Sequence, residues 1–220
     1  MNYMTYNPNN YDYSIIIKKI NTFIFQKVTN SNSNGIIIGL SGGIDSSVCL
    51  ALAANSLPGH NILGLILPID EITPKQDIDD AIFLAKKYKI EYRIIKINNI
   101  NSEYMKNLVY EKITQGNLFA RIRMNILYYH ANLMNRLVIG TGDKSEYLLG
   151  YFTKFGDGGA DICPIGDLFK TQVRILGKLL DLPENILIKK SGPKLWKDHI
   201  AEEEIGNTYE EIDKFLFQIE

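Results

Sequence analysis

Residues 39–47 read Gly-Leu-Ser-Gly-Gly-Ile-Asp-Ser-Ser, a glycine-rich turn with three hydroxyls and one carboxylate. The apolar run 36–38 precedes it and a second apolar run, 48–53, follows it, so the turn is expected to join a buried strand to a helix. At such a junction backbone N–H groups and the positive end of the helix dipole face an anion. Glycines let phosphate oxygens approach the backbone closely. The turn is therefore predicted to hold a pyrophosphate.

The carboxylate in this turn, Asp45, separates it from two commoner phosphate loops. A Walker loop ends in Gly-Lys-Ser/Thr, whereas residues 44–46 are Ile-Asp-Ser, which weighs against a kinase or GTPase. The fingerprint Gly-x-Gly-x-x-Gly is absent too, which weighs against a redox dinucleotide site. A carboxylate among phosphates is explained if it holds Mg²⁺. The alternative is an ordinary strand-to-helix turn capped by Asp45 and Ser46.

A second segment dense in glycine and charge spans residues 140–161. Long loops in compact domains are usually functional or disordered, and the aromatic and aliphatic side chains of this one favour function. Together with residues 116–124 and 163–170 it supplies carboxylates, cations and a hydroxyl. These groups would suit Mg²⁺, phosphates and a second anionic substrate.

Strands and helices that would position these loops alternate along the chain. Apolar runs predict strands at 36–40, 62–67, 92–97 and 137–140, and helical patterns predict helices at 11–29, 46–56, 74–89 and 117–135. Such alternation favours an α/β fold, a Rossmann-like three-layer sandwich with a mostly parallel sheet. Ligands of these sheets bind at the carboxyl ends of the strands, where the loops after residues 40, 67 and 140 begin.

Length and composition set further limits. At 220 residues the chain is expected to form a single domain, 1–220, with residues 1–12 flexible. Lys and Arg total 24 against 25 Asp and Glu, so no basic surface for nucleic acid is expected. Cys49 and Cys163 form no Cys-x-x-Cys pair, which favours a cytoplasmic location. Neither a signal peptide nor a membrane span is evident, so no membrane partner is expected.

The Ser-Gly-Gly-x-Asp-Ser signature resembles the pyrophosphate loop (PP-loop) of the ATP-pyrophosphatases, which have the adenine nucleotide alpha-hydrolase-like fold. The resemblance implies cleavage of ATP to AMP and pyrophosphate. It leaves the second substrate open, because NAD, GMP and asparagine synthetases, tRNA lysidine synthetases and thiolation enzymes share this loop.

Four blocks in order narrow the resemblance to ammonia-dependent NAD synthetase: the PP-loop, Gly-Asn-x-x-Ala-Arg-x-Arg-Met, the block from 140 to 161, and Pro-Ile-x-x-Leu-x-Lys. The match covers most of residues 35–218. It implies amidation of deamido-NAD to NAD, the final step of NAD biosynthesis, through an adenylated intermediate. Free ammonia is the expected nitrogen donor, since 220 residues leave no room for a glutaminase domain. A homodimer is implied, with the helices at 11–29 and 117–135 as candidate interface.

The resemblance also assigns roles to residues, with no covalent catalyst among them. It places Mg²⁺ on Asp45 and Glu146. It places deamido-NAD on Arg121, Lys154 and Asp161. It places ATP, the co-substrate, on Gly39, Leu40, Ser41, Gly42, Gly43, Ile44, Asp45, Ser46, Thr141 and Lys170.

Taken singly, most of these residues have a plainer interpretation. Arg121 and Arg123 could be surface charges, and Glu146 and Asp161 could cap a helix and a turn. Thr141 could end a strand, and Lys170 could begin an exposed amphipathic helix. Their joint order and spacing favour the functional interpretation.

The C-terminal part departs from the family pattern. Residues 191–195 are Ser-Gly-Pro-Lys-Leu where Pro-Ser/Thr-Ala-x-Leu is usual, so the hydroxyl expected at 192 is missing. Ser191 would replace it only with a shift of one residue, which Pro193 opposes. A basic tail with a His-Lys pair is also absent before Glu220. Two alternatives therefore stay open: another PP-loop enzyme that adenylates a different substrate, and a non-catalytic nucleotide-binding paralogue.

Overall fold

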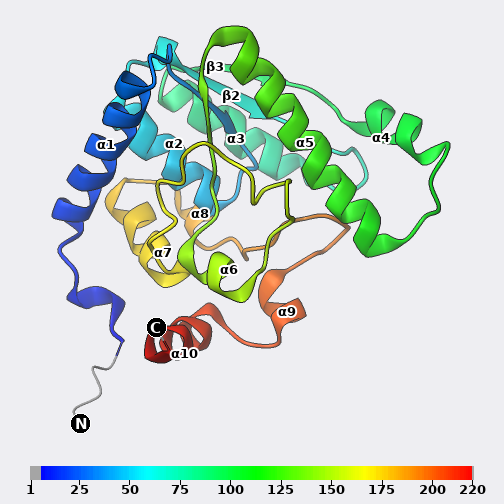
Figure 1. Ribbon diagram of the computed structural model, residues 1–220. Helices are drawn as coiled ribbons and strands as arrows, with labels where there is room; N and C mark the ends of the chain where they lie inside the picture. The colour runs from blue at the N-terminus through cyan, green and yellow to red at the C-terminus, as the bar shows by residue number, and fades with distance from the viewer. Residues whose placement is uncertain (1–5, 220) are drawn as a thin grey trace.

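The computed structural model describes residues 6–219 and contains a four-stranded parallel sheet in the order β3-β2-β1-β4 (Figure 1). The strands are β1 (Ile36–Gly39), β2 (Ile62–Ile66), β3 (Glu91–Ile94) and β4 (Leu137–Ile139). Ile36 of the central strand β1 lies opposite Ile62 of β2 and Leu137 of β4. All four predicted strands are therefore confirmed, each shorter than expected at its carboxyl end, where the chain turns into a loop.

Ten α-helices and two short 3-10 turns surround the sheet within residues 6–219. They are α1 (Tyr13–Asn30), α2 (Ile44–Ser56), α3 (Lys75–Lys87), α4 (Asn98–Met105), α5 (Lys112–Met134), α6 (Lys144–Leu149), α7 (Lys170–Leu179), α8 (Glu184–Leu187), α9 (Ala201–Ile205), α10 (Tyr209–Ile219), η1 (Pro8–Asn10) and η2 (Gly59–Asn61). The four predicted helices are confirmed. Helix α5 begins five residues earlier than predicted because the Glu111 carboxylate accepts the N–H groups of Ile113 at 3.0 Å and Thr114 at 2.7 Å.

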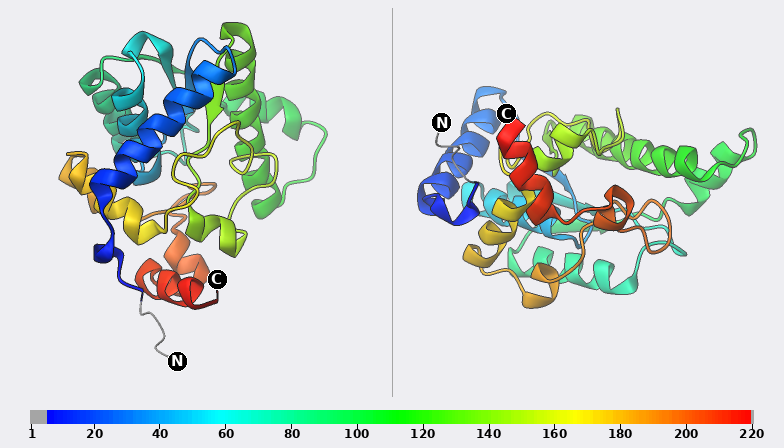
Figure 2. Two further views of the ribbon diagram at one scale, coloured as in Figure 1. Left: turned by 60° about the vertical axis from the view of Figure 1, so that its left-hand side comes forward. Right: turned by 90° about the horizontal axis from the view of Figure 1, so that it is seen from below.

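The side chains of β1 alternate between the two faces of the sheet, and helices cover both faces, so the molecule has three layers (Figure 2). Ile36 and Ile38 pack with α1, α2, α3 and α7 on one face of the sheet. Ile37 packs with α5 on the other face. Successive side chains of a strand point to opposite faces, so a strand covered on both sides is apolar throughout. The predicted three-layer α/β fold is thus confirmed.

A third apolar cluster joins the two ends of the described chain. Tyr6 is buried, and its ring lies 5.2 Å from those of Phe169 and Phe217. Its hydroxyl bonds the Thr171 Oγ1 at 2.7 Å. Of the segment 1–12, for which flexibility was expected, residues 1–5 lie outside the described residues, and Tyr6 is packed against α7 and α10.

One glycine brings the PP-loop against α3. Gly42 has φ +73°, and a Cβ added there would lie 2.2 Å from the carbonyl oxygen of Asp77. A side chain at 42 would meet both backbone strain and a collision with backbone. The close approach places the first turn of α3 at the PP-loop.

No helix within residues 6–219 combines the length and the apolar character that crossing a membrane requires.

Candidate active site

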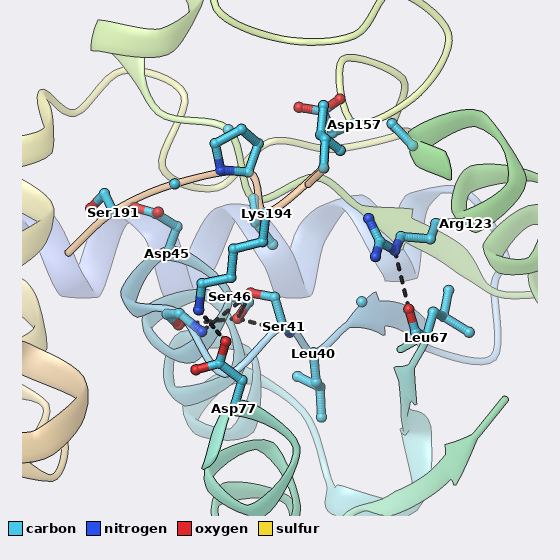
Figure 3. Close-up of a pocket in the computed structure, with 18 of the residues that line it drawn as sticks. Leu40, Ser41, Asp45, Ser46, Leu67, Asp77, Arg123, Asp157, Ser191 and Lys194 are labelled. Carbon is cyan, nitrogen blue, oxygen red and sulfur yellow. Dashed lines mark hydrogen bonds and ion pairs between the residues drawn. The ribbon is translucent and has the colours of Figure 1, made fainter. Parts of the chain in front are cut away.

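A cavity of about 250 Å³ opens at the carboxyl ends of β1, β2 and β4 (Figure 3). Helix α5 forms one wall, and the segment 189–195 crosses another. Eight of the ten predicted ATP-binding residues line this cavity: Gly39, Leu40, Ser41, Gly43, Ile44, Asp45, Ser46 and Thr141. Parallel strands therefore bring loops that are far apart in sequence to one edge, as predicted.

The PP-loop itself is organised by hydroxyls, and the N-terminus of α2 is left open. Ser46 Oγ accepts the Ser41 N–H at 3.3 Å and donates to the Gly43 carbonyl at 3.1 Å. Gly43 is the N-cap of α2, and no side chain caps it. Asp45 lies within the first helical turn, so the alternative of a turn capped by Asp45 and Ser46 is wrong. Free N–H groups and the helix dipole remain available for an anion.

Behind the PP-loop, the ammonium group of Lys170 is enclosed by three carboxylates. Its Nζ lies 2.8 Å from Asp45 Oδ1, 2.9 Å from Asp143 Oδ2 and 3.0 Å from Glu146 Oε1. Lys170 is fully buried, which overturns the interpretation of an exposed helix start. We call these four residues the Lys170 cluster. It carries one positive and, when fully ionised, three negative charges.

Two of these acids also form the start of α6. The Asp143 carboxylate accepts the Glu146 N–H at 2.9 Å, and Glu146 Oε2 accepts the Asp143 N–H at 3.2 Å. This is a reciprocal capping box. The plainer interpretation of Glu146 as a cap is therefore confirmed, yet its second oxygen is left to pair with Lys170. The Glu146 carboxylate thus caps α6 with one oxygen and pairs with Lys170 through the other.

Helix α10 braces the cluster through Asp213. The Lys170 backbone N–H donates to Ser145 Oγ at 2.9 Å, and that hydroxyl donates to Asp213 Oδ1 at 2.5 Å. The other oxygen of Asp213 accepts the Thr171 N–H at 2.8 Å. The Tyr209 ring lies 5.2 Å from the Lys170 ammonium. The C-terminal helix thus fixes the junction of α6 and α7.

Burial and mutual repulsion shift the protonation of the cluster. Burial raises the pKa of Glu146 to about 8 and that of Asp143 to about 6, with Lys170 opposing both shifts and the neighbouring acids adding to them. Burial alone would lower the pKa of Lys170, but the three carboxylates raise it well above its ordinary value. The ammonium is therefore permanently charged, and the acids share a proton near neutral pH.

The residues assigned to deamido-NAD lie outside the cavity lining. Arg121 is exposed and donates from Nε to the Lys154 carbonyl at 3.1 Å, so these two residues meet on the surface. Asp161 accepts the Val138 N–H at 2.7 Å and the Tyr128 hydroxyl at 3.2 Å. The three assignments stay predictions.

A different arginine, Arg123, enters the cavity. Its Nε donates to the Leu67 carbonyl at 3.1 Å, and Figure 3 shows its guanidinium turned toward the space between Leu67 and Asp157. Burial lowers its pKa to about 10, which leaves it charged at neutral pH. No carboxylate among residues 6–219 forms an ion pair with it within 4 Å. An enclosed guanidinium without an ion pair is suited to an anionic ligand.

A periodic signal could have distinguished the two arginines. Positions two apart on a helix point in nearly opposite directions, so Arg121 and Arg123 cannot share a face. Ala120, Met124 and Leu127 stand at helical spacing with Arg123, and all of them line the cavity.

The donor set of the cluster suits Mg²⁺. Asp45 and Glu146 line the cavity with side chains that are 21% and 22% exposed, so carboxylate oxygens, the ligands that Mg²⁺ prefers, face this space. Within residues 6–219 no group of three or more acids, histidines or cysteines forms a metal site by itself. Mg²⁺ commonly takes only one or two protein carboxylates, so a pair such as Asp45 and Glu146 would suffice to hold it.

The shifted acids predict how stability depends on pH. Because the pKa of Glu146 rises from 4.5 to about 8, the folded chain holds a proton that the unfolded chain has lost. The free energy of unfolding should therefore fall as the pH rises between these values. In metal-free buffer, Glu146→Gln should flatten this slope and exceed the parent chain by about 1 kcal/mol or more at pH 8. Urea titrations from pH 5 to 8 measure it.

The matched control is Glu103→Gln, because Glu103 pairs with Lys106 on the exposed surface and its side chain is 70% accessible. This variant should keep the parent slope. An unchanged slope in Glu146→Gln would contradict the assignment of the proton to the Lys170 cluster.

The comparisons with known proteins agree with this site. A family model described as NAD synthase matches residues 16–220. A curated relative from Staphylothermus marinus, an NH3-dependent NAD+ synthetase, is 52% identical over 214 residues, which is 96% of this chain and 78% of the relative. The predicted resemblance is thereby confirmed.

Two solved structures extend the similarity to three dimensions. An NMN synthetase from Francisella tularensis superposes with a TM-score of 0.89 at 41% identity, over 94% of this chain and 87% of that one. An NH3-dependent NAD synthetase from Campylobacter jejuni gives 0.77 at 41% identity, over 80% and 77%. Sequence, fold and site lead to the same conclusion: this chain belongs to the NAD synthase family.

Proposed function

We propose that the chain makes NAD from deamido-NAD, ATP and ammonia, releasing AMP and pyrophosphate. The observation that supports this most directly is the uncapped N-terminus of α2 beside the Lys170 cluster. It offers N–H donors for pyrophosphate next to acids suited to a cation. Four curated relatives with the name NH3-dependent NAD+ synthetase match 93–96% of this chain at 42–52% identity.

The chemistry requires positioning and charge stabilisation in place of a covalent catalyst. The nicotinate carboxylate is already an anion and attacks the α-phosphate of ATP, so pyrophosphate leaves. The N–H groups of α2, with Ser41 and Ser46, hold the leaving group as its charge develops. Ammonia then displaces AMP from the mixed anhydride. Arg123 faces the same cavity and would hold an anionic group of the second substrate.

Asp45 and Glu146 would hold Mg²⁺ at the phosphates. When bound there, it would supply positive charge that offsets the charge of the phosphates. Lys170 keeps the two carboxylates near each other before the cation arrives, at 2.8 and 3.0 Å from its ammonium.

A second candidate substrate is nicotinate mononucleotide. The solved structure named NMN synthetase has a TM-score of 0.89 with this chain, above the 0.77 of the Campylobacter NAD synthetase. Both substrates present the same reacting carboxylate, so the PP-loop chemistry does not distinguish them. The difference lies in what binds the rest of the dinucleotide.

The test of the proposed function supplies purified protein with Mg-ATP, ammonium and either deamido-NAD or nicotinate mononucleotide. We expect NAD from the first, with one pyrophosphate released per NAD, measured by chromatography and a coupled phosphate assay. Faster formation of the mononucleotide amide would favour the second candidate. Pyrophosphate release that does not depend on deamido-NAD or nicotinate mononucleotide would indicate another PP-loop enzyme. No turnover at all would favour a nucleotide-binding paralogue.

The proposed cation site is tested by removing its charge. Asp45→Asn should lower kcat/KM for ATP by about 100-fold or more and raise the Mg²⁺ concentration needed for half-maximal velocity. Asp167→Asn is the control, because Asp167 is exposed and absent from the cavity lining. If Asp45→Asn keeps the parent's Mg²⁺ dependence, the assignment of Asp45 as a metal ligand is wrong.

We also propose that the chain forms a homodimer through α5, one of the two helices predicted for the interface (11–29 and 117–135), together with the neighbouring α4. Their outer surface exposes large apolar side chains, among them Tyr104 at 46%, Tyr129 at 66% and Leu133 at 66%. A groove between the two helices is lined by Ile100, Ile122 and Ile126. Helix α5 continues from this face to the cavity, so a second copy seated here would stand next to the site.

Sedimentation of a charged variant tests this interface. Leu133→Glu should shift the protein from twice the chain mass to the mass of one chain, because it buries a charge in the apolar contact. Phe83→Glu, on α3 at the other face of the sheet, alters a phenylalanine that is 53% exposed and should leave the dimer intact. A parent chain that sediments as a monomer would exclude the dimer.

The remaining predictions are supported by simple observations. Cys49 and Cys163 are free thiols, which supports a cytoplasmic location. The net charge of −1 supports the absence of a nucleic-acid partner. A family match over residues 16–220 supports a single catalytic domain.

A further inference from the structure

The segment 189–195, here called the strap, crosses the cavity and is packed closely against its neighbours. The Ser191 carbonyl accepts the Ala201 N–H at 3.0 Å. A Cβ at Gly192 would lie 2.2 Å from the His199 carbonyl, and one at Gly116 would lie 2.9 Å from Leu195 Cβ. The strap is therefore held in place by backbone contacts, and its side chains project from a fixed support.

Two lysines of the strap meet one carboxylate at the PP-loop. Lys189 Nζ lies 2.7 Å from Asp77 Oδ1, 2.6 Å from Asp80 Oδ2 and 2.8 Å from the Gly42 carbonyl. Lys194 Nζ contacts the other oxygen of Asp77. Figure 3 shows the Lys194 side chain extended across the cavity toward Asp77, with Ser41 and Ser46 beside its end. Two ammonium groups thus lie at the loop that would hold pyrophosphate.

Lys189 and Lys194 differ in the number of hydrogen-bond acceptors around their ammonium groups. Lys189 has three acceptors, which is the full capacity of an ammonium. For Lys194, Asp77 is the one acceptor found among residues 6–219, so two of its N–H groups are unused. Lys194 also has φ +49°, a conformation that few residues with a side chain adopt. Such outliers concentrate at ligand sites.

Asp77 does not depend on Lys194 for its charge balance. If the Lys194 ammonium moved to a ligand, Asp77 would still be paired with Lys189 at 2.7 Å. No buried acid would be left uncompensated, which is the usual cost of breaking such a pair. The flexible stem of a lysine allows this movement without a change in the strap.

A further cation beside Arg123 would stabilise an anion as highly charged as ATP in this cavity. The Lys170 cluster bears three acids against one ammonium, and ATP adds several negative charges. A second observation also indicates a ligand at the strap: Ser191 lines the cavity, is 8% exposed, and its buried hydroxyl has no hydrogen-bond partner among residues 6–219. The strap therefore offers a cation and a hydroxyl to the same space.

We propose that Lys194 binds the pyrophosphate part of ATP, exchanging its contact with Asp77 for phosphate oxygens. The inference rests on the proposed function, since it assigns a residue to the same ATP site. It predicts that Lys194 contributes to the affinity for ATP and for pyrophosphate, and leaves the affinity for AMP unchanged. A charge-assisted hydrogen bond to phosphate is worth about a ten- to hundredfold change in affinity.

Binding measurements on Lys194→Met test this directly. Trp196, the single tryptophan of the chain, follows the strap and stacks on His199 at 3.5 Å, so its fluorescence can report ligand binding. Calorimetry gives the same constants independently. We expect Kd for Mg-ATP and for Mg-pyrophosphate to rise at least about tenfold, Kd for AMP to stay within about twofold, and Lys194→Arg to restore most of the loss.

Lys197→Met is the matched control. Lys197 stands three residues after Lys194, is exposed and is absent from the cavity lining. It should bind all three ligands like the parent chain. Lys194→Gln is measured as well as Lys194→Met, so that the test remains valid if one of the two variants fails to fold.

Two results would overturn the inference. One is a Lys194→Met or Lys194→Gln chain that binds Mg-ATP as Lys197→Met does. The other is an equal loss of AMP and ATP affinity, which would mean that Lys194 only shapes the strap. A parent chain that binds no Mg-ATP would instead refute the proposed function, so the two failures are distinguishable.

Discussion

The enclosed ammonium of Lys170 is the interaction on which the rest of the site depends. Three carboxylates from two helices and a cap meet it at 2.8 to 3.0 Å, and none of them would tolerate the others at this distance without a cation. Breaking such a buried cluster is costly because it strands a charge. The PP-loop, α6 and α7 are therefore fixed relative to one another before any ligand binds.

Much of the fold could be predicted because its signals are local. Strand β1 is apolar on both faces, and the glycine-rich turn that follows it has a recognisable composition. The segment between β4 and α7 could be predicted only as a functional loop, since its order comes from the capping box of α6 and from Asp213 on α10. Those contacts join residues far apart in sequence, so no periodic pattern in the sequence predicts them.

The site was predicted unevenly for the same reason. The composition of residues 39–47 predicted a turn for pyrophosphate, and the family resemblance assigned its residues to ATP, whereas the motif leaves position 143 unspecified and so gave Asp143 no role. Arg121 and Arg123 lie on opposite faces of α5, and the motif alone did not indicate which of the two faces the cavity. Lys189 and Lys194 have no signal before folding, because their partner Asp77 lies more than a hundred residues away.

Asp213 braces α7 from the last helix of the chain, so the site depends on contacts that span the sequence. Residues 45, 143, 146, 170 and 213 come from most of the length of the chain, so forming their contacts means closing long loops, which is slow and entropically costly. A partly folded chain would hold no ordered nucleotide pocket. A nucleotide that binds only the folded chain stabilises it, so ligand would protect the whole chain from proteolysis. A distant substitution that loosens α10 would then mimic the loss of an active-site residue.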